Sequence, residues 1–157
     1  MKRTGWLFVH LAFWLAAGAA LYFFFLRQES PPARLLGPDS VELARARDGH
    51  FHLDGAIQGT PVRFLIDTGA STVSISRDLA ARLGVACEHT SAFNTANGVV
   101  QGCTGRVSTL DFGPFRLENL TVAVLPQLTS EALLGMNALR HVHLVQKEDR
   151  LRLSLSE

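Results

Sequence analysis

The stretch Phe64-Leu65-Ile66-Asp67-Thr68-Gly69-Ala70-Ser71 carries the strongest structural signal in the chain. Three apolar residues typical of a buried strand lead directly into a carboxylate, a small hydroxyl residue and a glycine. Burying Asp67 at a strand end is costly unless hydrogen-bond donors surround it or it shares a proton. Thr68 supplies a hydroxyl, and Gly69 permits a tight turn whose N–H points back at the carboxylate. On the Asp-Thr-Gly tripeptide alone, an ordinary strand end closed by an Asx turn is the preferred interpretation.

Residues 49–157 show the pattern of a mainly β domain, because short apolar stretches alternate with turn residues at close spacing. The predicted strands are 51–53, 62–66, 72–75, 99–110, 115–117, 120–125, 143–145 and 151–153. Asn97-Gly98 predicts a tight hairpin turn, since both residues accept positive φ. A helix over residues 77–83 is expected between the N-cap Ser76 and Gly84, and a shorter one near residues 137–140. The sequence therefore predicts a compact barrel-like or sandwich-like domain.

The surroundings of the tripeptide give it a family resemblance. Asp67-Thr68-Gly69-Ala70, followed by Ser-Thr-Val-Ser-Ile-Ser, resembles the catalytic loop of aspartic proteases of the retroviral type. Leu133-Leu134-Gly135-Met136-Asn137 resembles the second signature of that family, two hydrophobic residues and a glycine followed by a short helix. The Asn97-Gly98 hairpin lies between them, where the family has its flap. The resemblance covers about residues 50–155 and implies a single-lobe, retropepsin-like barrel with one or two short helices.

The resemblance also implies an activity and a set of site residues. Asp67 would be the catalytic residue of an aspartic endopeptidase, and Thr68, Gly69 and Ala70 would support its loop. The flap would be formed by Ala96, Asn97 and Gly98, and the second signature contributes Leu133, Leu134, Gly135 and Asn137. The implied reaction uses carboxyl groups and water on a protein or peptide substrate, with no metal and no cofactor.

A homodimer follows from counting carboxylates. Two carboxyl groups about 3 Å apart share one proton, and the ionised one acts as a general base on a water between them. The chain contains a single Asp-Thr-Gly, so the second Asp67 must come from another copy related by two-fold symmetry. One departure weakens the match: retroviral members usually have arginine where this chain has Met136. The alternative is a non-catalytic module of the same fold that binds an extended peptide.

Residues 1–27 have the pattern of an uncleaved signal anchor. The 21 residues from 6 to 26 include no Asp, Glu, Lys or Arg, and as a helix they span roughly 30 Å, the thickness of a bilayer core. Lys2 and Arg3 precede this span, which predicts a single-pass protein with a cytoplasmic N-terminus and its protease domain outside. The anchor further resembles that of the single-lobe, membrane-tethered members of the family found in bacteria, which implies the bacterial inner membrane and a periplasmic protease domain. A cleavable signal peptide is the competing interpretation. Residues 28–48 contain Pro31-Pro32 and scattered charges, and are predicted to be a linker.

The remaining features exclude some functions and leave others open. The chain of 157 residues has a net charge of +1, and three of its 15 basic residues lie before residue 28, which leaves 12 against 14 acidic ones. A slightly acidic domain is a poor partner for nucleic acid. In the predicted hairpin Cys103 faces Ala92, so a disulfide with Cys87 is not expected unless the strand bends back. The pairs His50/His52 and His141/His143 would bind zinc only if their strands were neighbours.

Overall fold

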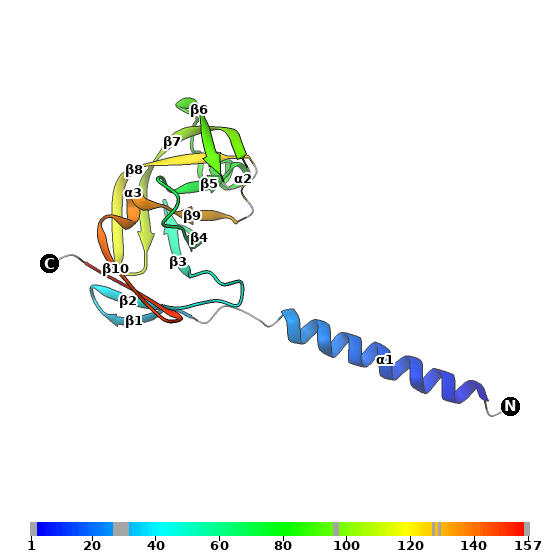
Figure 1. The fold of residues 1–157 in the computed structure, drawn as a ribbon. Coiled ribbons are helices and arrows are strands. Elements are labelled where there is room, and N and C mark those ends of the chain that lie inside the picture. The colour runs from blue at the N-terminus through cyan, green and yellow to red at the C-terminus, as the bar shows by residue number, and fades with distance from the viewer. Residues whose placement is uncertain (1–2, 27–31, 96–97, 127, 129, 156–157) are drawn as a thin grey trace. The chain divides into compact units, whose positions relative to one another are not determined.

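The structure is a computed structural model. It describes residues 3–26, 32–95, 98–126, 128 and 130–155. The chain divides into two compact units, Met1–Ser30 and Pro31–Glu157 (Figure 1).

The first unit contains one helix, α1 (Arg3–Leu26), which is 24 residues long. The ring of Trp6 packs edge-on against the ring of His10 one turn away, with 4.4 Å between the ring centroids. Within the described ranges, no helix combines the length and the apolar character that a membrane crossing requires. The expected transmembrane span over residues 6–26 is therefore not supported by the structure.

The second unit is built around a sheet of seven strands. They are β3 (His52–Ile57), β4 (Thr60–Ile66), β5 (Ser74–Ser76), β6 (His89–Thr95), β7 (Gly98–Phe112), β8 (Phe115–Leu125) and β9 (Ala132–Leu134), in the spatial order β3-β4-β9-β5-β8-β7-β6. Because β3 also pairs with β7, the sheet closes on itself as a barrel and leaves β6 at an edge. Closure brings Gly55 so close to Asp111 that a side chain at residue 55 would collide with the Asp111 carbonyl. The barrel thus requires a glycine at this crossing.

A second, four-stranded sheet forms from the two ends of the domain. Its strands are β1 (Arg34–Gly37), β2 (Ser40–Ala44), β10 (Val142–Lys147) and β11 (Arg150–Leu155), in the order β1-β2-β11-β10. All three neighbouring pairs are antiparallel. In Figure 1 this sheet lies at one end of the domain and β6 lies at the other.

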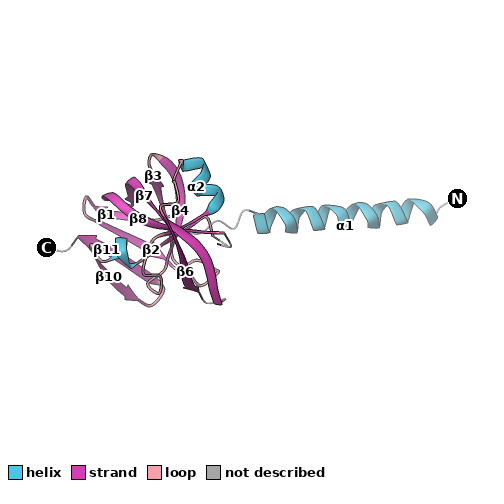
Figure 2. Cartoon of the chain, turned by 90° about the horizontal axis from the view of Figure 1, so that it is seen from above, coloured by secondary structure: helices cyan, strands magenta, loops and turns pink. Residues whose placement is uncertain are grey.

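Apolar side chains from both sheets form one core, and strands account for most of the domain (Figure 2). The largest fully buried side chains are Phe64, Phe112, Leu43, Leu53, Ile57, Ile75, Leu79, Leu110, Leu134, Leu139, Leu153 and Val41. Each such side chain contributes about 1.5–3 kcal/mol when it leaves water. Burial of this kind holds the barrel and the smaller sheet together.

The two short helices form where capping residues allow them. α2 (Arg77–Leu83) begins after Ser76, whose hydroxyl accepts a hydrogen bond from the Leu79 N–H at 3.2 Å. It ends at Gly84, which has a φ of 67° and is left-handed as a helix C-terminus commonly requires. α3 (Met136–Leu139) starts one residue earlier than the sequence predicts.

The interpretation of residues 28–48 as a linker is wrong over residues 34–44, which form β1 and β2. Val41 and Leu43 are 0% and 1% exposed, and their strand pairs with β11. The prolines and charges of this segment obscured a short alternation in which every second residue is apolar. Residues 32–48 therefore belong to the folded domain.

The hairpin between β6 and β7 has a different register from the predicted one. Thr95 pairs with Gly98 and Thr90 with Cys103, so Gly98 belongs to the ladder and not, as predicted, to the turn. Residues 96 and 97 lie outside the described part of the chain. The predicted hairpin implied a strand in place of β6 without giving its range, and β9 was not predicted. The predicted pair 115–117 and 120–125 is one strand, β8, in which Asn119 has a φ of 53°.

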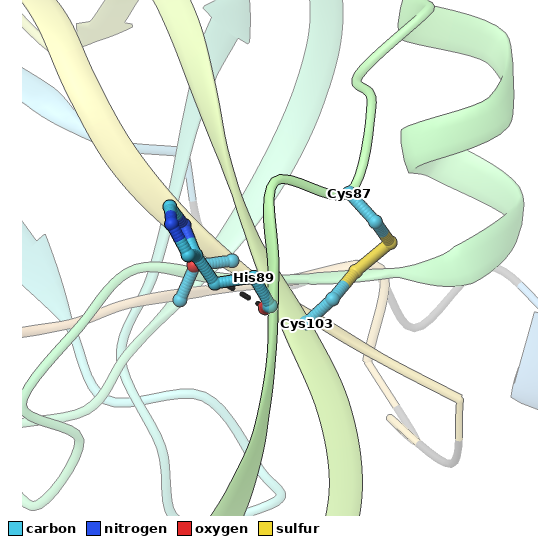
Figure 3. The surroundings of a disulfide bond; sticks show 4 residues. Cys87, His89 and Cys103 are labelled. Atoms are coloured by element: carbon cyan, nitrogen blue, oxygen red, sulfur yellow. Dashed lines mark hydrogen bonds between the residues drawn. A yellow bond between two sulfur atoms is a disulfide. The ribbon is translucent and has the colours of Figure 1, made fainter.

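The expectation against a disulfide is wrong. Cys87 and Cys103 are bonded, with 5.5 Å between their Cα atoms (Figure 3). The chain before β6 bends back over β7 instead of continuing the ladder, and Glu88 still donates its N–H to the Thr104 carbonyl at 2.8 Å. Gly105 makes this possible, because a side chain there would lie 2.6 Å from the Ala86 carbonyl oxygen. The bend thus brings Cys87 beside Cys103.

We expect the Cys87→Ser/Cys103→Ser variant to lose about 2–3 kcal/mol of unfolding free energy, because the cross-link restricts the unfolded chain between residues separated by 16 positions. Urea unfolding followed by far-ultraviolet circular dichroism measures this loss. A reductant should lower the unfolding free energy of the wild type by a similar amount and leave that of the variant unchanged. A wild type indifferent to reductant would contradict the disulfide.

Candidate active site

The Asp67 carboxylate is fixed by the loop that follows β4. Its Oδ1 atom accepts a hydrogen bond from the Gly69 N–H at 2.9 Å, and the Asp67 N–H donates to the Leu134 carbonyl at 3.1 Å. The Ala70 N–H lies 3.3 Å from the Asp67 carbonyl oxygen and closes the turn. The side chain is half-buried, while Thr68 and Gly69 are exposed. The carboxylate is therefore oriented by one backbone donor, the Gly69 N–H, and remains reachable from outside.

The sheet order explains why this loop takes its path. β9 lies between β4, to which it is parallel, and β5, to which it is antiparallel. The chain must therefore cross the end of β9 between residues 67 and 73. Gly135 lies directly under the crossing, and a Cβ atom there would be 2.5 Å from the Thr72 carbonyl group and 2.9 Å from the Ala70 carbonyl oxygen. Only glycine allows the two segments to approach so closely.

Hydrogen bonds from the start of α3 hold the crossing in place. The Met136 N–H donates to the Ala70 carbonyl at 2.7 Å, and the Asn137 N–H donates to the Ser71 carbonyl at 3.1 Å. The Asn137 side chain accepts from the Val73 N–H at 2.7 Å and donates to the Thr121 carbonyl at 2.8 Å. One amide thus ties the Asp67 loop, α3 and β8 together.

A cleft of about 460 Å³ opens between the Asp67 loop and the hairpin of β6 and β7. Its lining residues are Asp67, Gly69, Ala70, Ser71, Thr72, Ser74, Phe93, Asn94, Thr95, Val100, Leu125, Leu128 and Leu133. Among these described residues Asp67 is the one ionisable side chain. The remaining surface is apolar or neutral, so the cleft surrounds a single carboxylate with groups suited to a peptide.

A more open hollow of about 380 Å³ lies beside the loop and is lined by Thr68, Gly69, Ser71, Met136, Asn137 and Arg140. The sequence-predicted site residues are therefore distributed over two surfaces. Asp67, Ala70 and Leu133 line the cleft, whereas Thr68 and Asn137 line the hollow, and Gly69 lines both. Leu134 is 0% exposed and belongs to the core.

The hairpin that was predicted as a flap does line the cleft, through its strands. Gly98 is exposed and has a φ of 103°, and Ala96 and Asn97 lie outside the described residues. Five further residues of the cleft wall were not predicted from the sequence: Phe93, Asn94, Val100, Leu125 and Leu128. Alternation in residues 89–95, where Ser91 and Phe93 are half-buried between exposed neighbours, is the signal that could have located β6.

The histidine pairs do not form a metal site. His52 begins β3 in the barrel and His143 lies in β10 of the other sheet, so their strands are not neighbours. The His52 ring instead lies 2.7 Å from Asp48, and the His50 N–H together with this ring holds the pKa of the Asp48 carboxyl below its usual value. Among the described residues no three His, Cys, Asp or Glu side chains are grouped to hold a metal ion.

We expect Asn137→Ala to lower the unfolding free energy by about 2 kcal/mol, because it leaves the Val73 N–H and the Thr121 carbonyl without their partner. The matched control is Asn94→Ala, an exposed strand position, which should change stability by less than about 0.5 kcal/mol. Urea unfolding of both variants gives the comparison. Equal stability of the two would show that the Asn137 amide does not hold the crossing.

Two curated proteins are similar to this chain in sequence. The chain is 30% identical over 123 residues to the "Uncharacterized protein in cobV 5'region" of a Sinorhizobium species, a match covering 74% of this chain and 52% of the relative. It is 34% identical over 61 residues to the "Uncharacterized protein RP867" of Rickettsia prowazekii, covering 37% of this chain and 26% of that protein. The chain thus spans about half the length of the first relative and about a quarter of the second.

A solved structure and a protein family both match this chain. The crystal structure of a retropepsin-like aspartic protease from Rickettsia conorii superposes with a TM-score of 0.65 at 28% identity, covering 74% of this chain and 90% of that one. Residues 53–141, more than half of the chain, match the family described as "gag-polyprotein putative aspartyl protease". The chain therefore belongs to this aspartyl protease family and has a retropepsin-like fold.

Proposed function

We propose that the protein is an aspartic endopeptidase that hydrolyses peptide bonds as a homodimer, with Asp67 of each copy as the catalytic residue. The observation that carries the proposal is the position of Asp67. It is the one ionisable side chain among the described residues of the cleft, and the Gly69 N–H holds its carboxylate in a fixed orientation. The retropepsin-like fold supports the same reaction.

The chemistry uses two Asp67 carboxyl groups that share one proton. Two such groups about 3 Å apart do not both ionise, so one is a base and the other an acid. The ionised carboxylate takes a proton from a water molecule as this water attacks the scissile carbonyl carbon. The protonated carboxyl donates a hydrogen bond to the carbonyl oxygen, and a proton then passes to the leaving amine. Neither step requires a metal ion.

The need for a second copy follows from the cleft, which receives one carboxylate from one chain. Thr68 and Gly69 are exposed on the loop that a second Asp67 must approach. Met136 lies beside them in the open hollow and is 37% exposed, at the position where retroviral proteases usually have arginine. An exposed apolar side chain next to an exposed loop is a surface that two copies can bury. We therefore place the two-fold axis at this face.

The substrate that fits the cleft is an extended peptide with an apolar side chain near the scissile bond. Phe93, Val100, Leu125, Leu128 and Leu133 provide an apolar lining around Asp67. β6 is an edge strand in the described sheet, so its free side can accept a peptide strand by backbone hydrogen bonds. Contacts of this kind position the scissile carbonyl against the carboxyl pair.

A periplasmic location is part of the proposal. What supports it is the Cys87–Cys103 disulfide, because such bonds persist in oxidising compartments and are rare in the reducing cytoplasm. Anchoring of the chain at the inner membrane through residues 6–26 stays a sequence prediction.

A non-catalytic peptide-binding module is the second candidate function. The observation that favours it is again the single carboxylate of the cleft: a chain that remains monomeric keeps the groove and the edge strand but has no acid–base pair. The two candidates therefore differ in whether two copies meet.

We expect Asp67→Asn to lower the rate of peptide cleavage by at least about a thousandfold, since an amide cannot act as the base. The matched control is Asp54→Asn, an exposed position on β3 outside the cleft, which should cleave at the wild-type rate. Digestion of a peptide library, analysed by mass spectrometry, compares the purified proteins. Undiminished cleavage by Asp67→Asn would remove the assignment.

We expect mixtures of wild type and Asp67→Asn to reveal the shared site. At a fixed total concentration and equal proportions, only about one quarter of randomly formed dimers carry two Asp67 residues. Cleavage should therefore fall to about a quarter of the wild-type rate. A monomeric enzyme would retain about half, and this result would refute the dimer. Sedimentation velocity on the same samples reports the oligomeric state directly.

A further inference from the structure

The hairpin that forms one wall of the cleft leaves the barrel at Cys103. β7 is paired with β8 from Phe112 opposite Phe115 up to Cys103 opposite Val124. Beyond this point, from Gly102 to Gly98, the described ladder of β7 continues with β6 alone. Cys103 is therefore the last residue of β7 in the described ladder with β8.

The disulfide joins the root of β6 to this same point. Cys87 lies in the bend just before β6 and is bonded to Cys103 (Figure 3). Cys103 is 6% exposed. In the described ladders β6 pairs only with β7, and five of its seven residues are exposed. Its burial therefore contributes little to holding it. The cross-link is a covalent attachment of an otherwise weakly held strand to the rigid barrel.

The part of the hairpin beyond the disulfide carries cleft residues. Phe93, Asn94 and Thr95 from β6 and Val100 from β7 face the same cleft as Asp67. The opposite wall is held independently, since β4, β9 and the Asn137 amide fix the Asp67 loop. The two walls of the cleft are thus held by separate contacts.

We propose that the Cys87–Cys103 disulfide is a positioning element for substrate binding, and that its reduction by a small dithiol weakens substrate binding at the Asp67 cleft. This inference rests on the proposed protease function. Its physical basis is the placement of the bond at the point where the hairpin leaves the barrel. The disulfide sets the position of Phe93 and its neighbours, and the two thiols leave that position to the β6–β7 ladder alone.

The redox step is an ordinary thiol–disulfide exchange. A thiolate of the dithiol attacks one sulfur of the disulfide and forms a mixed disulfide, releasing the other cysteine as a thiolate. The second thiol of the reductant then displaces the remaining cysteine and becomes oxidised to a cyclic disulfide. Two electrons pass to the protein, and both cysteine thiolates take up protons from water. Cys87 belongs to the exposed bend, which gives a small reductant access to the bond.

The test compares four forms of the full chain under conditions where each is folded. They are the oxidised wild type, the wild type reduced with dithiothreitol, Cys87→Ser/Cys103→Ser, and Val41→Ala. Val41 is 0% exposed in the smaller sheet, so its truncation destabilises the domain far from the hairpin. This control separates a general loss of stability from a change at the cleft. Each form is assayed for peptide cleavage and for amide hydrogen exchange.

We expect KM to rise at least about fivefold in the reduced and serine forms, with kcat within about twofold of the oxidised wild type. Amides of residues 89–95 and 98–102 should exchange at least about tenfold faster, while those of β4 and β9 keep their rates. The Val41→Ala control should keep the KM and the hairpin exchange rates of the oxidised wild type. Dithiothreitol should change neither quantity in the serine form. This set of results would support the proposal.

The opposite results would overturn it. An unchanged KM in the serine form, or an equal rise of KM in Val41→Ala, would show that the disulfide acts only on overall stability. Unchanged exchange in residues 89–95 and 98–102 would overturn it equally. If no form cleaves peptides, the protease function fails, and isothermal titration with a statine-containing peptide decides the inference. Weaker binding to both the reduced wild type and the serine form, with Val41→Ala binding as tightly as the oxidised wild type, would then support the positioning role, and equal or undetectable binding to all forms would refute it.

Discussion

The crossing of the Asp67 loop over β9 is the contact on which the rest of the site depends. The loop leaves β4, passes over Gly135 and returns as β5, and a side chain at Gly135 would overlap the backbone at Thr72. The Asn137 amide then ties Val73, at the end of the crossing, to Thr121 of β8. Because Asp67 and Leu134 are far apart in the chain but hydrogen-bonded, the carboxylate reaches its position only when the barrel has formed.

This dependence explains which parts of the fold the sequence predicts. β4, β8 and α2 carry strong local signals, an apolar run or a capped helix, and their positions are close to the predicted ones. β2 has only a weak local signal in the sequence, since Val41 and Leu43 alternate with polar residues over a single short strand. Its burial comes from pairing with β11, more than a hundred residues away, and no local pattern contains that partner.

The site divides in the same way. Asp67 and the second signature were identified because both occur as contiguous motifs, whereas the cleft wall at Phe93 and Val100 arises from the register of a hairpin. In that register Gly98 pairs with Thr95 instead of lying in the turn, which places Thr90 rather than Ala92 opposite Cys103. The disulfide depends further on a bend before β6 that Gly105 permits. Neither the hairpin register nor the bend before β6 can be predicted from the spacing of residues in the sequence.

The two walls of the cleft are consequently held by different forces. The Asp67 wall is part of the closed barrel, where displacement would expose apolar core and break several backbone hydrogen bonds at once. The hairpin wall depends on one ladder and one covalent bond. The proposed peptide hydrolysis would need carboxyl groups in a fixed geometry, whereas a long substrate would need a wall that can move to admit it. The Cys87–Cys103 bond lies where the barrel and the hairpin wall meet. A bond nearer the hairpin turn would stiffen the whole hairpin wall, and a bond inside the barrel would not attach the hairpin to it.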